Sequence, residues 1–165
     1  MRKAIKGVEE FYAHAIAIER EAMERYAEFE AWFRDRGEEV LAGLCANLAR
    51  MEAAHLRELV STCRGMRLPT IAAGEHTWLD VGSPEAPARE LFYRVAQPRH
   101  LLEIALQAEC NALSYFEWVA RDTTDPSVRA LAEELAGEER EHVRWATQAL
   151  EYHPSGRINW EGALL

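Results

Sequence analysis

Four long stretches of this chain repeat apolar residues at steps of three and four, and this periodicity constrains the fold more than any other feature. The stretches run over residues 3–35, 38–63, 98–121 and 126–152. Because an α-helix completes a turn every 3.6 residues, each stretch predicts an amphipathic helix with one apolar face. Gly37 ends the first helix, and Asp125 followed by Pro126 predicts the N-cap and first position of the fourth.

The connections between these helices predict the topology. Short turns join the first helix to the second and the third to the fourth, so we expect two antiparallel hairpins. Roughly 35 residues separate the hairpins, enough to run the length of a bundle, and within them "APARELFYRV" predicts a short helix. The expected fold class is all-α: a four-helix bundle with one long crossover over residues 1–153, followed by an irregular tail at 154–165.

The two halves of the chain resemble each other. "AIEREAMERY" parallels "QAECNALSYF", and "LCANLARMEAAH" parallels "LAEELAGEEREH". The alignment also matches three pairs of ionisable residues: Glu19 with Glu109, Glu52 with Glu139, and His55 with His142. Duplication accounts for the repeated apolar positions, but it does not account for acids on the apolar faces.

Helical phase places these six residues on the inward faces. Glu19, for example, lies four residues after Ala15 and three before Ala22, so its side chain shares their face. An isolated buried carboxylate costs on the order of several kcal/mol, and four of them repel one another. Two divalent cations would balance four carboxylates, and neutral imidazoles would complete the coordination. This donor set suits iron or manganese better than zinc.

Purely structural roles are the alternatives to a metal site. A single Glu-x-x-His on a helix is usually a solvent-exposed pair, and a single buried Glu or His can be a satisfied polar group of the core. Here two such pairs lie on matching faces, and each is partnered by an inward Glu on the preceding helix. That combination favours a metal site over structural polarity repeated by duplication.

The motifs Glu-x-x-Ala-x-x-x-Tyr at Glu19, Glu-x-x-Ala-x-x-x-Phe at Glu109, and Glu-x-x-His at Glu52 and Glu139 resemble those of the ferritin-like di-iron carboxylate superfamily. Within it the chain is most similar to the rubrerythrin-like proteins, over about residues 5–150. The resemblance implies two iron ions, with manganese or zinc as possible substitutes, and bridging roles for Glu52 and Glu139. The implied metal ligands are Glu19, Glu52, His55, Glu109, Glu139 and His142, with no catalytic residue beyond them.

Two departures from the rubrerythrins bear on function. Rubrerythrins carry a rubredoxin domain, whereas Cys45, Cys63 and Cys110 are scattered thiols that cannot build one. Rubrerythrins also have a second Glu three residues after the third-helix ligand, a position held here by Ala112. The missing carboxylate weakens the inference to peroxidase chemistry.

The function implied by the resemblance is a di-iron oxidoreductase of peroxidase or ferroxidase type. The reduced site would react with hydrogen peroxide or dioxygen and take electrons from an external donor. Ferritin-like iron oxidation, storage or handling is a second hypothesis. A third is a structural metal-binding bundle without catalysis.

Composition bears on partners and location. The net charge of -9 argues against a nucleic-acid partner or an anionic membrane surface. No apolar run is long enough to span a membrane, and the N-terminal residues do not predict a signal peptide. Three thiols without a pairing framework fit a reducing compartment, so we expect a cytoplasmic protein.

Large apolar residues remain once the inward faces are filled, and they predict assembly. These residues are Phe11, Ile18, Trp32, Trp118 and Trp145. Because two-fold dimers are the commonest way to bury such a surplus, we expect a homodimer formed mainly by the first hairpin. Ferritin cages typically add a fifth helix, and "PSGRINWEGALL" does not predict one, so we expect no hollow cage.

Overall fold

The computed structural model describes residues 5–72 and 83–152, and the regular structure within these ranges is helical throughout. Its elements are α1 (Val8–Arg34), α2 (Glu39–Thr62), α3 (Arg89–Phe92), α4 (Pro98–Asp122) and α5 (Pro126–Glu151). All four long helices are confirmed, three of them to within one residue at both ends, and α3 lies within the segment expected to hold a short helix. The predicted tail at 154–165 lies outside the described residues.

The first helix differs from its prediction at one end. It begins at Val8, because Gly7 is fully extended and breaks the helical backbone, whereas Lys3 was the predicted start. At the other end Gly37 has a φ of +74°, a left-handed conformation that favours glycine and reverses the chain. The Asp125 carboxylate caps α5 by accepting hydrogen bonds from the backbone N–H groups of Ser127 (2.8 Å) and Val128 (3.4 Å).

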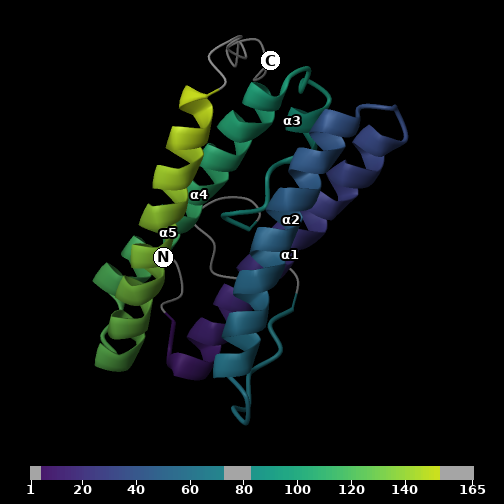
Figure 1. Ribbon diagram of the computed structural model, residues 1–165. Helices are drawn as coiled ribbons and strands as arrows, with labels where there is room; N and C mark the ends of the chain where they lie inside the picture. The colour runs from purple at the N-terminus through teal and green to yellow at the C-terminus, as the bar shows by residue number, and fades with distance from the viewer. Residues whose placement is uncertain (1–4, 73–82, 153–165) are drawn as a thin grey trace.

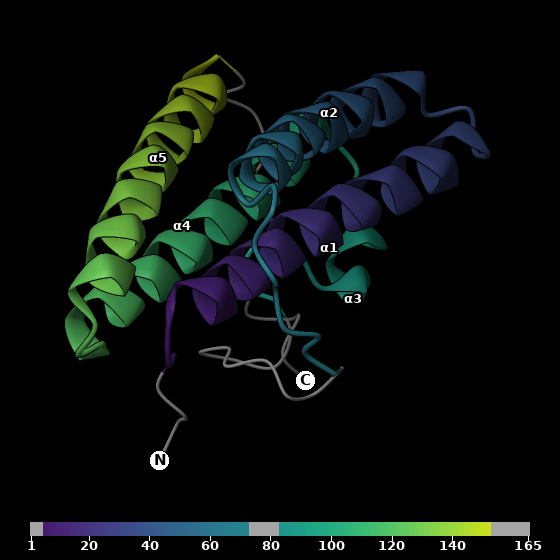
Figure 2. The ribbon, with the colours of Figure 1, turned by 90° about the horizontal axis from the view of Figure 1, so that it is seen from below.

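The long helices pack as two hairpins. Helix α1 lies along α2, and α4 lies along α5, as Figures 1 and 2 show from two directions. Contacts between the hairpins are sparser and run from α2 to α4 and from α1 to α5. This arrangement is consistent with the predicted helical bundle and its crossover.

A polar layer divides the apolar core into two parts. One buried cluster gathers around Phe11, Tyr115 and Phe116, and the other around Tyr26, Phe33 and Leu101. Along α1, α2 and α4 the two apolar clusters flank the inward acids or histidine, so the predicted site lies between them. A layer of this kind requires charge compensation, because apolar packing surrounds it on both sides.

The crossover is fastened to the C-terminal half of α1. Phe92 of α3 stacks on Phe29, and Arg89 forms an ion pair with Glu28 at 2.9 Å. The Arg25 guanidinium donates a hydrogen bond to the carbonyl oxygen of Pro87. Figure 2 shows α3 beside α1. These contacts fix the path of the segment just before α3.

The prediction that Phe11 and Ile18 remain outside the filled faces is wrong. Both side chains are fully buried, and Phe11 packs edge-on against Phe116 of α4 with ring centroids 6.1 Å apart. Helix α1 contacts both its hairpin partner and the second hairpin, so its buried arc is wider than one stripe. Trp145 is exposed, whereas Trp32 and Trp118 are partly buried. No helix among the described residues is long and apolar enough to cross a membrane.

Candidate metal centre

The first hairpin brings together Glu19 of α1 with Glu52 and His55 of α2. The His55 Nδ1 atom lies 3.6 Å from Glu19 Oε2 and 3.4 Å from Glu52 Oε2. Both carboxylates are buried, and one ligand atom from each residue lies within 4.8 Å of the others. Because residues three apart share a helical face, Glu52 and His55 face Glu19 together. We call these three residues the hairpin-1 cluster.

The second hairpin repeats the arrangement with Glu109 of α4 and with Glu139 and His142 of α5. The His142 Nδ1 atom lies 3.3 Å from both Glu109 Oε2 and Glu139 Oε2. Glu109 and Glu139 are each 2% exposed. We call these three residues the hairpin-2 cluster, and the match with the first follows the internal repeat of the sequence.

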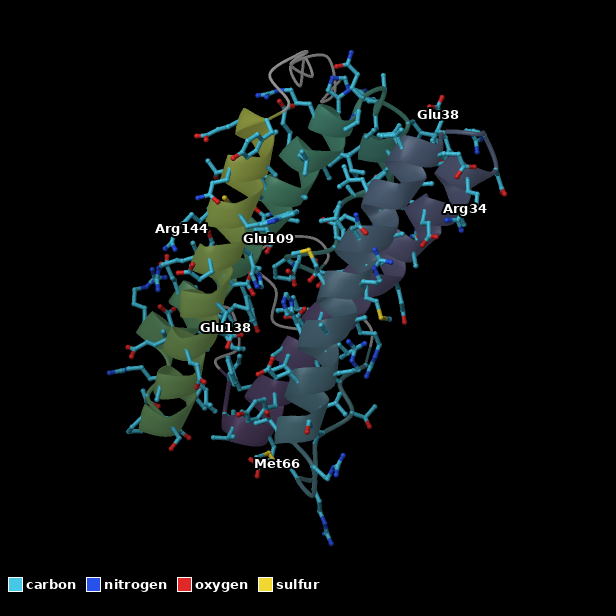
Figure 3. The ribbon with its side chains drawn as sticks, viewed as in Figure 1. Arg34, Glu38, Met66, Glu109, Glu138 and Arg144 are labelled. Atoms are coloured by element: carbon cyan, nitrogen blue, oxygen red, sulfur yellow. The ribbon has the colours of Figure 1, made fainter. Side chains whose placement is uncertain are left out.

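The two clusters face each other across the bundle. The imidazole rings of His55 and His142 stack with centroids 4.4 Å apart and planes 10° apart. In Figure 3 Glu109 lies partway along the bundle, between the end marked by Arg34 and Glu38 and the end marked by Met66. The six residues singled out from the sequence thus gather in one place.

A seventh residue, Glu85, was missed by the sequence analysis. It lies in the crossover, is 1% exposed, and offers a ligand atom within 4.8 Å of those of the hairpin-2 cluster. Helical periodicity could not identify it, because Glu85 belongs to no helix. A lone acid in a stretch that contains Pro84 and Pro87 carries no phase information.

Burial raises the pKa values of the clustered carboxyl groups. Burial is the main cause of the rise for Glu52, to about 7, and for Glu139, to about 8, although the neighbouring histidines partly oppose it. The pKa of Glu85 is also raised by burial and then by the charges of Glu19 and Glu52. Without a cation these groups compete for protons.

The neighbouring carboxylates raise the pKa values of both histidines, although burial alone would lower them. Interactions with Glu19 and Glu52 raise the pKa of His55 to about 10. Burial lowers the pKa of His142, but interactions with Glu109 and Glu139 outweigh it and raise the pKa to about 11. In the metal-free protein both imidazoles are therefore protonated at neutral pH. Their positive charge partly compensates the carboxylates, as a bound cation would.

The donor atoms fit a metal ion in each cluster. Ligand atoms about 2.1 Å from a common ion, at tetrahedral or octahedral angles, lie about 3.0–3.4 Å from one another. The observed separations between Nδ1 and the carboxylate oxygens, 3.3–3.6 Å, are close to that range. Glu19 Oε2, both oxygens of Glu52 and Glu109 Oε2 have no hydrogen-bond partner among the described residues. Oxygen and imidazole donors of this kind suit iron, manganese or zinc.

A small cavity of about 70 Å³ borders the hairpin-1 cluster between α1, α2 and α5. Glu19 and His55 line its inner part, and three further acids also line it: Glu58, Glu134 and Glu138. Glu138, labelled on α5 in Figure 3, is exposed, and its pKa is raised by burial and then by Glu58 and Glu134. Helical phase thus separates Glu138 in the cavity wall from Glu139 in the cluster.

Tyr26 adjoins the site from α1. Its side chain is 1% exposed, and its pKa is raised well above the ordinary value by burial and then by the charges of Glu52 and Glu109. The phenol therefore stays protonated beside the clusters.

One solved structure is similar to this chain along most of its length. The crystal structure of an uncharacterized conserved protein from Magnetospirillum magnetotacticum MS-1 has 29% sequence identity and a TM-score of 0.68, and the match covers 93% of this chain and 100% of that one. No protein-family model matches the chain, and no match is found among curated proteins. This similarity supports the helical fold. The possible chemistry of the site is inferred from the two clusters of this chain.

Proposed function

We propose that this chain is a ferritin-like, rubrerythrin-like di-iron carboxylate protein that reacts with hydrogen peroxide or dioxygen and takes electrons from an external donor. The observation that carries the proposal is the pair of matching buried clusters, which face each other with two carboxylates and one imidazole each. One ion would be held by Glu19, Glu52 and His55, and the other by Glu109, Glu139 and His142.

A bound iron pair would supply the two electrons that, with two protons, reduce one hydrogen peroxide molecule to two water molecules. The chain supplies the frame for this chemistry. Two helices of each hairpin hold the carboxylates at fixed levels, and the apolar clusters on both sides limit the access of water. Binding of the ions would release the protons that Glu52 and Glu139 hold in the metal-free chain, where their pKa values are raised.

Two neighbouring glutamates on α5 offer a matched test. We expect iron-reconstituted wild-type protein and Glu138→Gln to contain two iron ions per chain, because Glu138 lies outside both clusters. Glu139→Gln removes a buried carboxylate ligand and should lose at least one ion. Elemental analysis gives the count. One iron per wild-type chain, or none, would contradict the di-iron assignment.

The acid-lined cavity favours a second candidate function, iron oxidation and handling. Glu58, Glu134 and Glu138 line the cavity beside the hairpin-1 cluster, and a cavity lined by one sign of charge concentrates the opposite ion. Peroxide consumption coupled to an added reductant would favour the oxidoreductase. Net uptake of many irons per chain would favour iron handling, and an inert bound metal would indicate a structural role.

A further inference from the structure

Among the candidate ligands in the described residues, Glu85 alone comes from outside the four long helices. Its carboxylate is buried, and neither oxygen has a hydrogen-bond partner within residues 5–72 and 83–152. A buried carboxylate without donors is strongly destabilising unless a positive charge compensates it. The position of Glu85 thus requires a cation or a proton.

The surroundings of Glu85 indicate where that cation would lie. One of its oxygens lies within 4.8 Å of ligand atoms of Glu109, Glu139 and His142. The Glu85 carboxylate is therefore part of the group of ligand atoms formed by the hairpin-2 cluster. Glu85 is therefore directed into the candidate metal centre.

The crossover holds Glu85 in this place through contacts on its C-terminal side. Two residues beyond Glu85, the carbonyl oxygen of Pro87 accepts a hydrogen bond from Arg25. Four residues beyond it, Arg89 pairs with Glu28, and Phe92 then stacks on Phe29. These contacts hold the segment, and therefore its ligand, in a fixed position. A loop without such contacts would leave the ligand mobile.

We propose that Glu85 is a ligand of the metal ion held by the hairpin-2 cluster. This inference rests on the proposed metal-binding function. The hairpin-2 ion would then have one more protein ligand than the hairpin-1 ion, so the two positions would be unequal. The crossover thereby adds a carboxylate to a cluster whose other residues come from α4 and α5.

Two ions held in this way would leave the more open coordination on the hairpin-1 side. That cluster has one fewer protein ligand, and the cavity of about 70 Å³ lies beside its Glu19 and His55. A small oxidant would therefore meet the hairpin-1 ion, while Glu85 covers the hairpin-2 ion.

The test is a titration of the full metal-free chain with Co²⁺, followed by calorimetry and visible absorption. The variant is Glu85→Gln, and the matched control is Glu90→Gln, which removes an exposed carboxylate from the same segment. We expect wild type and Glu90→Gln to bind two Co²⁺ per chain. Glu85→Gln should bind one of them at least about tenfold more weakly and leave the other unchanged.

Two further measurements separate a ligand from a structural residue. Metal-free Glu85→Gln should melt at or above the wild-type temperature, because a buried amide is neutral without a bound proton or cation. In the wild-type chain, Co²⁺ should slow hydrogen exchange of the backbone N–H groups of Glu85, Ala86 and Ala88, because the ion ties the crossover to the bundle.

The outcomes distinguish this inference from the proposed function. Unchanged Co²⁺ affinities in Glu85→Gln, a lower melting temperature of its metal-free form, or unaltered exchange in the wild type would each overturn the role of Glu85. Failure of the wild-type chain to bind Co²⁺ at all would overturn the proposed metal-binding function itself.

Discussion

Glu138 and Glu139 are neighbours in the sequence, yet their carboxylates meet different surroundings. Glu138 is exposed at the cavity wall, whereas Glu139 is 2% exposed and faces His142. Successive residues of an α-helix are rotated by about 100° about its axis, and this rotation is enough to move a side chain from solvent into the core. The chemistry of an acid in this protein is therefore set by its helical phase.

The ionisable residues of the clusters predict how the metal-free protein responds to pH. Burial raises the pKa of Glu52 from 4.5 to about 7 and that of Glu139 from 4.5 to about 8. The pKa values of His55 and His142 rise from 6.5 to about 10 and about 11. Across these windows the folded chain holds more protons than the unfolded chain, so its stability falls as pH rises.

We therefore expect the melting temperature of the metal-free protein to decrease between about pH 5 and pH 9, each extra proton contributing a slope of at most about 1.4 kcal/mol per pH unit. Scanning calorimetry at several pH values measures this. The metal-loaded protein should depend on pH much less, because the ions replace the protons and stabilise the fold by mass action. A flat profile for the metal-free protein would contradict the prediction.

At the scale of elements, the short helix α3 decides where the crossover lies. Phe92 is 2% exposed and packs on Phe29 and Phe33 of α1, whereas its neighbour Tyr93 is 73% exposed. Since Glu85 lies a few residues before α3, the packing of Phe92 also helps to position that carboxylate.

We expect Phe92→Ala to lower the free energy of unfolding by about 3–5 kcal/mol, because it opens a cavity between α1 and the crossover. The matched change Tyr93→Ala should cost less than about 1 kcal/mol, since that ring is largely in solvent. Urea denaturation of the metal-free proteins measures both. Equal losses for the two variants would mean that α3 is not anchored through Phe92.

The long helices could be predicted from the sequence because their signals are local. Periodic apolar residues, the left-handed Gly37 and the capping Asp125 each act within a few residues of the helix ends they define. The six inward residues followed from the same phase. Glu85 could not be predicted, because its place depends on contacts such as that between Arg25 and Pro87, which are distant in sequence.

The error over Phe11 and Ile18 has a related cause. Periodicity identifies the centre of an apolar face, but the width of the buried arc depends on how many neighbours a helix meets. Because α1 contacts α2 and α5, residues at the margin of its stripe are also buried. An interface of the expected homodimer must therefore consist of residues that are exposed in the single chain, which excludes Phe11 and Ile18.

At the scale of the whole molecule, the first hairpin has an apolar groove lined by residues of α1, α2 and the segment that follows α2. Ile16, Leu56, Val60 and Leu68 line it together with arginines that include Arg57, and its volume is about 790 Å³. Contiguous exposed apolar surface commonly marks an interaction site, and two-fold dimers are the commonest oligomers. The groove lies on the hairpin through which we expect the dimer to form.

Two exposed valines on α2 provide a matched test of this homodimer. Val60, 49% exposed, lines the groove, whereas Val40, 71% exposed, lies near the other end of the helix and outside it. At micromolar concentration, light scattering should give a dimeric mass for the wild type and for Val40→Glu. A charge at Val60 would have to be buried in the interface, so Val60→Glu should be monomeric. A monomeric wild type, or a Val60→Glu dimer, would remove the groove as the interface. A 24-subunit mass would instead contradict the expected absence of a cage and would favour iron storage over peroxide chemistry.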